Sequence, residues 1–264
     1  MDKALKHRVN AARVALRNQT EFFSNLRGQV SSEWKADDTR VTFADFAITE
    51  KLFAELRRSF PGDQLLSEES VPMDEVVELD SRYAWVLDPI DGTNNYALGM
   101  PCCAISLALL KEGRPVYGLI FDGGTGELLE GGPGQPLRVN GRKVTRLPGN
   151  FDRRGGMVAL HFPLPAGRAR QLEYLMEHYR VRSLGSAALH LAYVALGRID
   201  GALDERVRPW DIAAAVCLLE AAGVAIHYLD EQPFPLQKLE MQGPFIRYMA
   251  GTTDFLKSME NWLG

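Results

Sequence analysis

The run DPIDGT combines side chains that could hold a metal ion beside a phosphate group. Asp88 and Asp91 lie three residues apart, with Pro89 directly after the first of them. Pro89 has a fixed φ, lacks an N–H and biases Asp88 toward an extended conformation. The segment is therefore kept out of a regular helix, and both carboxylates can point the same way. Two fixed carboxylates are typical ligands of hard divalent cations such as Mg²⁺.

The Gly92-Thr93 pair follows at the point where we expect a strand to turn into a helix. Backbone N–H groups at the start of a helix have no partner within it and can bind a phosphate. Metal ligands followed at once by such a turn predict metal-assisted chemistry on a phosphate ester. Each piece alone has an ordinary interpretation, because Asp-Pro is typical of a turn and Gly-Thr of a helix start.

Further acidic residues lie beside apolar sequence at a distance from this segment. In LLSEES, Glu68 and Glu69 follow a short apolar pair at the end of an expected strand. If that segment is extended, only one of the two can face the site, because adjacent side chains alternate. Asp211 in RPWDIAAA starts an expected helix, where it could simply be the N-cap. Carboxylates from three separate elements indicate an assembled site rather than solvated surface.

In these residues the chain resembles the inositol monophosphatase family of Mg²⁺-dependent, lithium-sensitive phosphomonoesterases. The matching segments, in chain order, are Glu68–Ser70, Asp88–Thr93 and Trp210–Asp211, with a weaker match at Val41–Asp45 that follows Lys35. The resemblance covers essentially the whole chain. It implies a layered αβαβα sandwich that mixes α+β and α/β parts, of the inositol monophosphatase and fructose-1,6-bisphosphatase type, with the site between the halves.

The resemblance also implies two or three Mg²⁺ ions per site. The implied oxygen ligands are Glu68, Asp88 and the backbone carbonyl of Ile90 for the first ion; Asp88, Asp91 and Asp211 for the second; and Asp45, partly through water, for a weaker third. The implied catalytic set is Thr93, which orients the attacking water with Glu68 and Asp45. A divalent metal lowers the pKa of bound water and neutralises charge on the phosphoryl oxygens.

Two positions near these ligands remain open from the sequence. The family alignment favours Glu68 over Glu69 as the ligand, which would leave Glu69 solvated or behind the ligands. Lys35 could position a site carboxylate or be a solvated surface lysine. Clustered carboxylates repel one another strongly without metal, so the site should be loose when empty.

The residues implied to contact the substrate match the family pattern less closely than the metal ligands do. The implied contacts are Asp91, Gly92, Thr93, Gly185, Ser186, Ala187, Asp204 and Asp211. Ser186 could instead be an ordinary helix N-cap. Asp204 stands where the inositol phosphatases place a glutamate, with Glu205 beside it, so the exact substrate stays open. Arg206 and Arg208 could bind a second phosphate or a carboxylate, or could simply be solvated.

We therefore expect Mg²⁺-dependent hydrolysis of a small phosphate monoester by metal-activated water, with inositol monophosphate as the preferred substrate. Rivals from the same superfamily are fructose-1,6-bisphosphate, 3′-phosphoadenosine 5′-phosphate and histidinol phosphate. An alternative of another class is a metal-binding regulatory protein without turnover. The chain lacks the GxxxxGK[ST] motif of P-loop NTPases and the GxSxG motif of serine hydrolases. The resemblance implies a homodimer.

Composition excludes several other classes. The 264 residues are 46% hydrophobic and 24% charged, which is ordinary for a globular chain with a large core. A net charge of −4 gives no basic footprint for nucleic acid. Three cysteines without a C-x-x-C pair predict neither a disulfide framework nor zinc. No signal peptide or membrane-spanning run is evident, so we expect a cytoplasmic protein without a membrane partner.

Apolar spacing predicts the elements that must position these groups. We expect helices from Leu5 to Leu26 and over Ala44–Phe60. Expected strands are Leu65–Ser67, Ala84–Leu87, Ala104–Leu110 and Val116–Phe121, with glycine-rich turns at Gly123–Gly126 and Gly131–Gly134.

Strands and helices are expected to alternate in the second half, as in an α/β architecture. The expected elements are strands near Val158–Leu160 and Val181–Ser183, and helices near Arg168–His178, Ala187–Leu196 and Ile212–Ala222. His190 fits the apolar pattern of its helix and is expected to be structural. Leu147–Gly156 resembles a boundary, which gives an N-terminal α+β part (1–150) carrying most metal ligands. The C-terminal α/β part (151–264) then carries Asp211 and the substrate loop.

Overall fold

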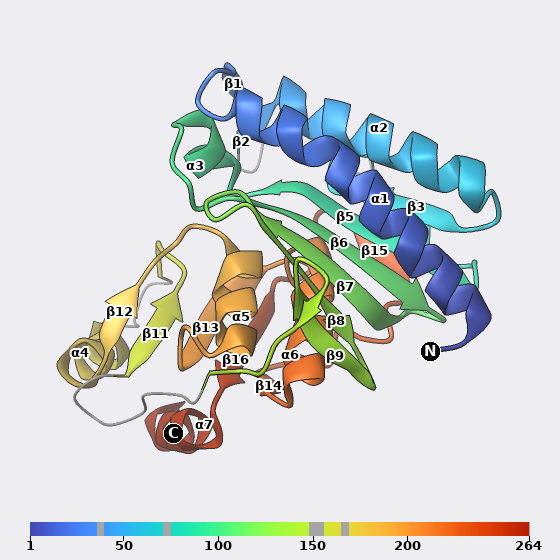
Figure 1. The fold of residues 1–264 in the computed structure, drawn as a ribbon. Helices are drawn as coiled ribbons and strands as arrows, with labels where there is room; N and C mark the ends of the chain where they lie inside the picture. Colours follow the sequence, from blue (N-terminus) through green and yellow to red (C-terminus); the bar gives the residue numbers. More distant parts are fainter. Residues whose placement is uncertain (36–39, 71–74, 148–155, 165–168, 264) are drawn as a thin grey trace.

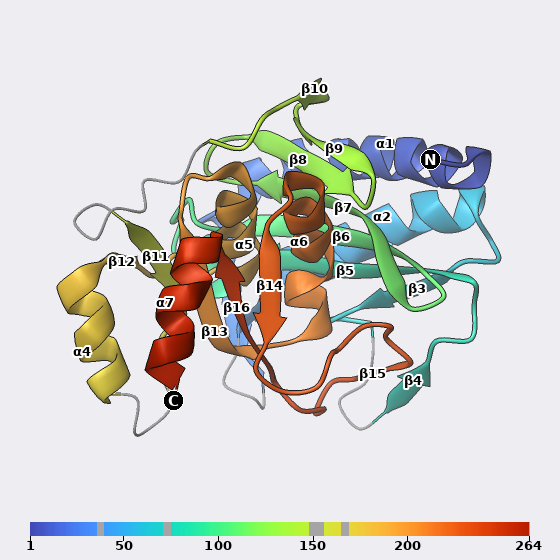
Figure 2. The same ribbon diagram turned by 90° about the horizontal axis from the view of Figure 1, so that it is seen from below.

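The structure, a computed structural model, describes residues 1–35, 40–70, 75–147, 156–164 and 169–263. The helices are α1 (Lys3–Leu26), α2 (Phe43–Ser59), α3 (Thr93–Ala97), α4 (Ala169–His178), α5 (Ala187–Leu196), α6 (Pro209–Ala222) and α7 (Thr253–Leu263). Helices α1 and α2 cover one face of a large sheet, and α5 and α6 lie between it and a second sheet (Figure 1). Helices α4 and α7 lie outside the second sheet (Figure 2). The architecture is the expected αβαβα sandwich.

The large sheet has seven strands in the order β10-β9-β8-β7-β6-β5-β3. Its strands are β3 (Gln64–Ser67), β5 (Tyr83–Asp91), β6 (Ala104–Lys111), β7 (Arg114–Asp122), β8 (Glu127–Gly132), β9 (Gln135–Val139) and β10 (Arg142–Lys143). All neighbours in it are antiparallel except β3, which runs parallel to β5. Two short ribbons also form, from β1 (Ser32–Trp34) with β2 (Arg40–Thr42) and from β4 (Val76–Glu78) with β15 (Lys238–Glu240).

The second sheet has five strands in the order β12-β11-β13-β16-β14. Its strands are β11 (Met157–Leu160), β12 (Arg180–Arg182), β13 (Gly201–Val207), β14 (Ala225–Tyr228) and β16 (Ile246–Gly251). Strand β11 runs parallel to both of its neighbours, and β16 runs antiparallel to both of its own. The parallel pair of β11 and β13 brings their carboxyl ends to the same edge of the sheet.

The central strands β5 and β6 are buried on both faces, which explains their nearly continuous apolar sequence. In β5, Trp85 and Leu87 belong to the core beneath α1 and α2, whereas Ala84 and Val86 belong to the core shared with α5 and α6. Helix α6 approaches so closely that a Cβ on Gly118 would collide with the carbonyl of Ala214. The second core therefore contains residues from both halves of the chain, and the division into 1–150 and 151–264 stays a prediction.

Most expected elements are confirmed with shifts of a few residues, and three differences matter. The strand expected at Ala84–Leu87 continues to Asp91, and the helix expected from Ile212 begins at Pro209. The turn expected at Gly131–Gly134 was wrong in part, because Gly131 and Gly132 lie in β8. There a Cβ on Gly132 would collide with the carbonyl of Val116, so close strand packing requires glycine.

Two further expectations concern the chain boundary and the membrane. Most of the boundary expected at Leu147–Gly156 falls on residues 148–155, outside the described residues. In the part of the chain that the structure describes, no helix is both long and apolar enough to cross a bilayer.

Candidate metal and phosphate site

Three carboxylates converge between the two sheets. Asp88, Asp91 and Asp211 can each offer an oxygen such that these atoms all lie within 4.8 Å of one another. Residues three apart on a regular strand point to opposite faces. The pairing of β5 with β6 is irregular between Asp88 and Asp91, and this irregularity lets both carboxylates face the site. Asp211 reaches them from the first turn of α6.

Backbone contacts fix the DPIDGT segment in place. The carboxylate of Asp88 accepts the N–H of Ile90 at 3.0 Å, and the Thr93 hydroxyl donates to the Ile90 carbonyl at 2.8 Å. Gly92 begins α3 with φ of 88°, where a Cβ would also collide with the carbonyl of Cys102. The strand therefore turns directly into a helix, as expected from the Gly-Thr pair.

Asp91 binds the start of α5. Its Oδ2 accepts the Ser186 hydroxyl and the Ala188 N–H, each at 2.6 Å, and its Oδ1 accepts the Ala187 N–H at 3.3 Å. The Ser186 hydroxyl also accepts the Leu189 N–H at 3.2 Å, so Ser186 is the N-cap of α5 as well. The structure thus brings the expected Gly185–Ala187 loop against the carboxylate cluster, with Ser186 acting through Asp91.

Helix N-termini surround the carboxylates. Asp45 is the third residue of α2, and its Oδ2 accepts both the N–H and the hydroxyl of Thr42 at 2.7 Å. Asp211 is likewise the third residue of α6 and accepts the Arg208 N–H at 2.6 Å. Asp211 is therefore not the N-cap, which is Arg208, but a first-turn carboxylate that accepts the N-cap backbone N–H. The positive ends of these helix dipoles, with that of α5, offset part of the repulsion among the carboxylates.

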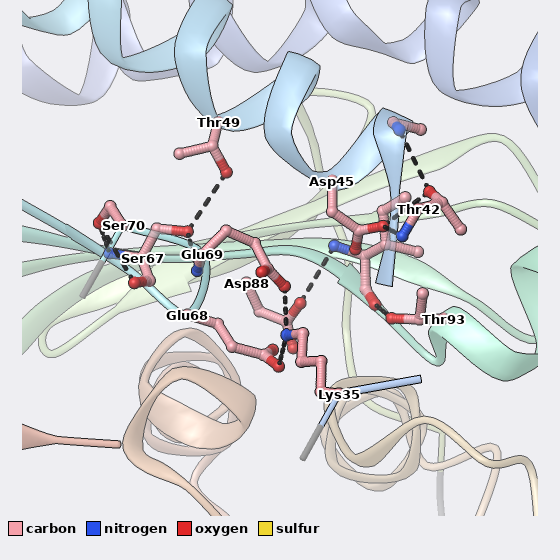
Figure 3. Close-up of polar contacts among 12 residues, drawn as sticks. Lys35, Thr42, Asp45, Thr49, Ser67, Glu68, Glu69, Ser70, Asp88 and Thr93 are labelled. Carbon is pink, nitrogen blue, oxygen red and sulfur yellow. Dashed lines mark hydrogen bonds and ion pairs between the residues drawn. The ribbon is translucent and has the colours of Figure 1, made fainter. Parts of the chain in front are cut away.

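Both glutamates of the LLSEES block contact Lys35. Its Nζ lies 2.6 Å from Glu68 Oε1 and 2.5 Å from Glu69 Oε1 (Figure 3). The condition under which only one glutamate can face the site is not met, because β3 ends at Ser67 and both residues lie in the turn that follows. Glu69 is not solvated, since its side chain is 6% exposed against 19% for Glu68.

Lys35 is likewise a buried partner rather than a solvated lysine. Burial alone would lower its pKa, but the charges of Glu68 and Glu69 outweigh that effect and raise the pKa above its usual value. Lys35 therefore stays charged and holds the two glutamates together.

The buried carboxylates hold their protons more tightly than usual. Burial, together with the charges of neighbouring carboxylates, raises the pKa of Asp88 and of Asp211 well above the ordinary value. Burial raises the pKa of Asp45 to about 7 and that of Asp91 to about 6, against hydrogen bonds that lower both. Oxygen ligands with raised pKa values, clustered in a buried site, fit a divalent cation that would supply the missing positive charge.

The expected substrate residues lie on β13 and beyond it. Asp204 is buried, and its Oδ1 accepts the Arg206 N–H at 3.0 Å. Its charge contributes to the raised pKa of Asp211, so the two carboxylates interact electrostatically. Arg208 is not simply solvated, because its guanidinium donates to the Gly243 carbonyl and lies 4.1 Å from the ring centroid of Phe245.

The neighbours of Asp204 differ in exposure. Arg206 is exposed, with its guanidinium 5.2 Å from the ring centroid of Phe245. Glu205 is buried and acts electrostatically on Arg247. Asp204 is thus the residue of this group that lies beside the carboxylate cluster.

Sequence reasoning missed one residue of this region and placed another correctly. His161 follows β11 directly and lies 3.6 Å from Asp204, and its position after the apolar run MVAL could have indicated it. His190 is structural as expected. It is buried, its Nε2 accepts the Leu184 N–H at 2.9 Å, and burial lowers its pKa to about 3.

Comparisons with known proteins identify the family. The sequence model of the inositol monophosphatase family matches residues 1–247. An inositol-1-monophosphatase of Mesorhizobium japonicum is 34% identical over 230 residues, which cover 84% of either protein. Nus factor SuhB of Pasteurella multocida is 32% identical over 203 residues, covering 75% of this chain and 74% of the relative.

A solved structure shares the fold. An IMPase/NADP phosphatase complexed with Mg²⁺ and phosphate superposes with a TM-score of 0.85 at 22% identity, covering 99% of this chain and 97% of that one. From the family match and these relatives, the chain belongs to the inositol monophosphatase family.

Proposed function

We propose that this protein is a Mg²⁺-dependent phosphatase of small phosphate monoesters, with inositol monophosphate as its preferred substrate. The observation that carries the proposal is the convergence of Asp88, Asp91 and Asp211, held by backbone and helix N-termini beside the Gly92-Thr93 turn. If the three aspartates were purely structural, cationic side chains of the protein would have to neutralise them. Lys35 contacts this region, but it is bound by Glu68 and Glu69.

Oxygen donors of the right kind for two or three Mg²⁺ ions are present. The residues that would hold them are Glu68, Asp88, Ile90 through its carbonyl, Asp91, Asp211 and Asp45. When bound, Mg²⁺ lowers the pKa of water and neutralises charge on phosphoryl oxygens. Asp45, Asp88, Asp91 and Asp211 of this set have raised pKa values, which is the electrostatic condition that a divalent cation relieves.

The chain's own residues would orient water and phosphate. The Thr93 hydroxyl gives its proton to the Ile90 carbonyl, so its oxygen is left to accept a hydrogen bond from water. Asp45, with a pKa of about 7, can take up a proton near neutral pH. Together with Glu68 these residues form the proposed catalytic set, and the amides of Gly92 and Thr93 would hold the phosphate.

The remaining parts of the proposal rest on the family. Gly185, Ala187 and Asp204 would contact the alcohol part of the substrate, while Ser186 contributes by holding Asp91. A homodimer and a cytoplasmic location are proposed on the same basis. Fructose-1,6-bisphosphate, 3′-phosphoadenosine 5′-phosphate and histidinol phosphate remain alternative substrates.

Relatives named Nus factor SuhB favour a second candidate, a metal-binding regulatory protein without turnover. The two candidates differ in whether the chain needs a water-orienting hydroxyl. Thr93 would serve that role in the phosphatase, whereas in a protein that only binds metal its hydroxyl would serve only to hold the Ile90 carbonyl.

Phosphate release tests the proposal directly. Purified protein is assayed with inositol 1-phosphate and the three alternative esters, with Mg²⁺ and with EDTA. We expect Mg²⁺-dependent release, fastest from inositol 1-phosphate. Release from none of the four esters, with Mg²⁺ binding detected by calorimetry, would favour the regulatory candidate.

A further inference from the structure

Asn95 is a buried side chain that holds two distant stretches of backbone beside the Gly92-Thr93 turn. It lies in α3, and its Nδ2 donates to the carbonyls of Cys102 and Leu184 at 2.7 Å each. Both N–H bonds of the amide are therefore used, and both go to the main chain. Leu184 comes 89 residues later, so the contact joins the DPIDGT segment to the loop that leads into α5 (Figure 1).

Leu184 is held from both sides. Its carbonyl accepts from Asn95, and its N–H donates to His190 Nε2 at 2.9 Å. His190 is fully buried, and burial lowers its pKa to about 3, so the ring is neutral near neutral pH and keeps a lone pair for this bond. Because the N–H and the carbonyl of Leu184 are both bonded to side chains, the backbone that precedes Gly185 is fixed in place.

The surroundings of Gly92 and Gly185 show how closely the two segments approach. A Cβ on Gly92 would come within 2.8 Å of the Cys102 carbonyl oxygen and 3.0 Å of the Gly185 carbonyl oxygen. A Cβ on Gly185, where φ is +70°, would come within 2.8 Å of Asn95 Nδ2. Gly92 therefore lies between two stretches of backbone, and Asn95 is bonded to both of them.

The bonds of Asn95 complement those of Asp91 at the same loop. Asp91 accepts the Ser186 hydroxyl and the Ala188 N–H, each at 2.6 Å, whereas Asn95 donates to the Leu184 carbonyl. One side chain thus binds donors of the loop and the other binds an acceptor. Removing the Asp91 carboxylate would also remove a proposed metal ligand. Asn95 carries no charge, so its side chain can be changed without removing a ligand.

We propose that Asn95 is a positioning residue, which fixes the Gly92-Thr93 turn relative to the start of α5. This inference rests on the proposed phosphatase function, because the turn holds the phosphate in that proposal. A displaced turn would misalign the phosphate with the metal ligands on every ester, since all of them share the phosphoryl group. A misplacement of about 1 Å can lower a rate by roughly 10²-fold.

Turnover and stability measured together test the inference. Asn95→Ala is compared with Tyr96→Phe, a matched control in the same helix, because the Tyr96 hydroxyl donates to the Phe23 carbonyl on α1 at 2.8 Å. Both variants lose bonds to backbone carbonyls, so both should lower Tm. At saturating Mg²⁺ and well below Tm, we expect Asn95→Ala to lower kcat about 10-fold or more on inositol 1-phosphate and on p-nitrophenyl phosphate, with KM within about twofold. Tyr96→Phe should keep kcat within about twofold on both esters.

Hydrogen exchange gives a readout that needs no turnover. The amides of Leu184, Ala188 and Leu189 are hydrogen-bonded at the start of α5. We expect them to exchange about 10-fold faster in Asn95→Ala and at the wild-type rate in Tyr96→Phe. If Asn95→Ala does not fold, Asn95→Ser keeps one donor and is measured in the same way, with a loss of kcat of about threefold expected.

The outcomes separate this inference from the proposed function. A folded Asn95 variant with kcat within about twofold of wild type would overturn the inference and leave the phosphatase intact. An equal loss of kcat in Tyr96→Phe, or failure of both Asn95 variants to fold, would also overturn it, because Asn95 would then serve stability alone. If the wild-type protein cleaves neither ester, the proposed function fails, and the exchange rates decide whether Asn95 fixes the start of α5.

Discussion

The DPIDGT segment and the His161–Asp204 pair line the same site and are built in opposite ways. In the segment, Asp88 and Thr93 are tied to the backbone of Ile90, and Asp91 is tied to the start of α5. In the pair, one nitrogen and one oxygen are buried with no hydrogen-bond partner among the described residues. The segment is thus fixed by hydrogen bonds within the fold, whereas the pair keeps one unpaired atom on each side chain.

This difference predicts how substitutions behave. Changes in the segment should affect all esters equally, because they alter metal binding or water orientation. The largest effect is expected at Asp91.

Asp91→Asn should reduce kcat/KM by roughly 10³-fold on every ester, the upper range for losing an electrostatic contact at a reacting centre. The amide can still accept one hydrogen bond from α5, so circular dichroism should show a folded protein. The matched control is Asp63→Asn, because Asp63 is a buried carboxylate that pairs with Arg8 at 2.7 Å away from the site. A rate within threefold of wild type in Asp91→Asn would remove Asp91 from the metal site.

Thr93→Ala should lower kcat by about 10²-fold, a typical contribution of a group that orients a proton transfer. Steady-state assays at saturating Mg²⁺ measure the effect, and Thr93→Ser keeps the hydroxyl as the matched control. An unchanged kcat in Thr93→Ala would exclude the hydroxyl from the mechanism.

Glu68→Gln and Glu69→Gln test which glutamate serves the metal. Both contact Lys35, but Glu68 is the more exposed of the two, and its charge is the largest carboxylate effect on Asp88. We expect Glu68→Gln to lower kcat/KM about 10-fold or more and raise the Mg²⁺ requirement, and Glu69→Gln to stay within about threefold. The reverse order would make Glu69 the ligand and overturn the assignment that the family alignment favours.

Mg²⁺ should stabilise the protein more at pH 8 than at pH 5.5. Burial raises the pKa of Asp45 to about 7 and of Asp91 to about 6, from 3.8. The folded state then binds these protons more tightly than the unfolded chain. Without metal, their contribution to the free energy of unfolding falls as pH rises from about 4 to about 7. A bound metal ion offsets the unfavourable burial of these charges at pH values where Asp45 and Asp91 are ionised.

Thermal unfolding with Mg²⁺ and with EDTA measures this difference. We expect the Mg²⁺-induced rise in Tm to be larger at pH 8 by roughly 2–5 °C, as for a ligand that binds only the folded state. Equal rises at both pH values would show that these carboxylates do not take part in metal binding.

Local patterns in the sequence predicted the DPIDGT segment well, because its geometry depends on neighbouring residues. Pro89, Gly92 and Thr93 act within a few positions of one another, and the strand-to-helix turn formed as expected. The alternation argument does not apply to Glu68 and Glu69, because the strand ends at Ser67, as expected, and both glutamates lie in the turn that follows. Their orientation depends on that turn, which strand alternation does not describe.

Long-range register could not be predicted in the same way. His161 meets Asp204 only because Leu160 pairs with Leu203 across two strands that are far apart in the sequence. Likewise, the role of Ser186 depends on its contact with Asp91. The resemblance to a family supplied the proposed ligands on α2 and α6, since a carboxylate in the first turn of a helix has the same local sequence pattern whether or not it binds metal.

The contact between Asp91 and Ser186 has a consequence for synthesis of the chain. Ser186 comes 95 residues later, which at roughly 5–20 residues per second is about 5–20 s of translation. Until then Asp91 lacks its hydrogen-bond donors at the start of α5, and the sheet face that α6 covers in the folded protein is exposed to solvent. The site is thus among the last parts of a nascent chain to form. A fragment that ends at residue 150 should bind a hydrophobic dye that the full chain excludes.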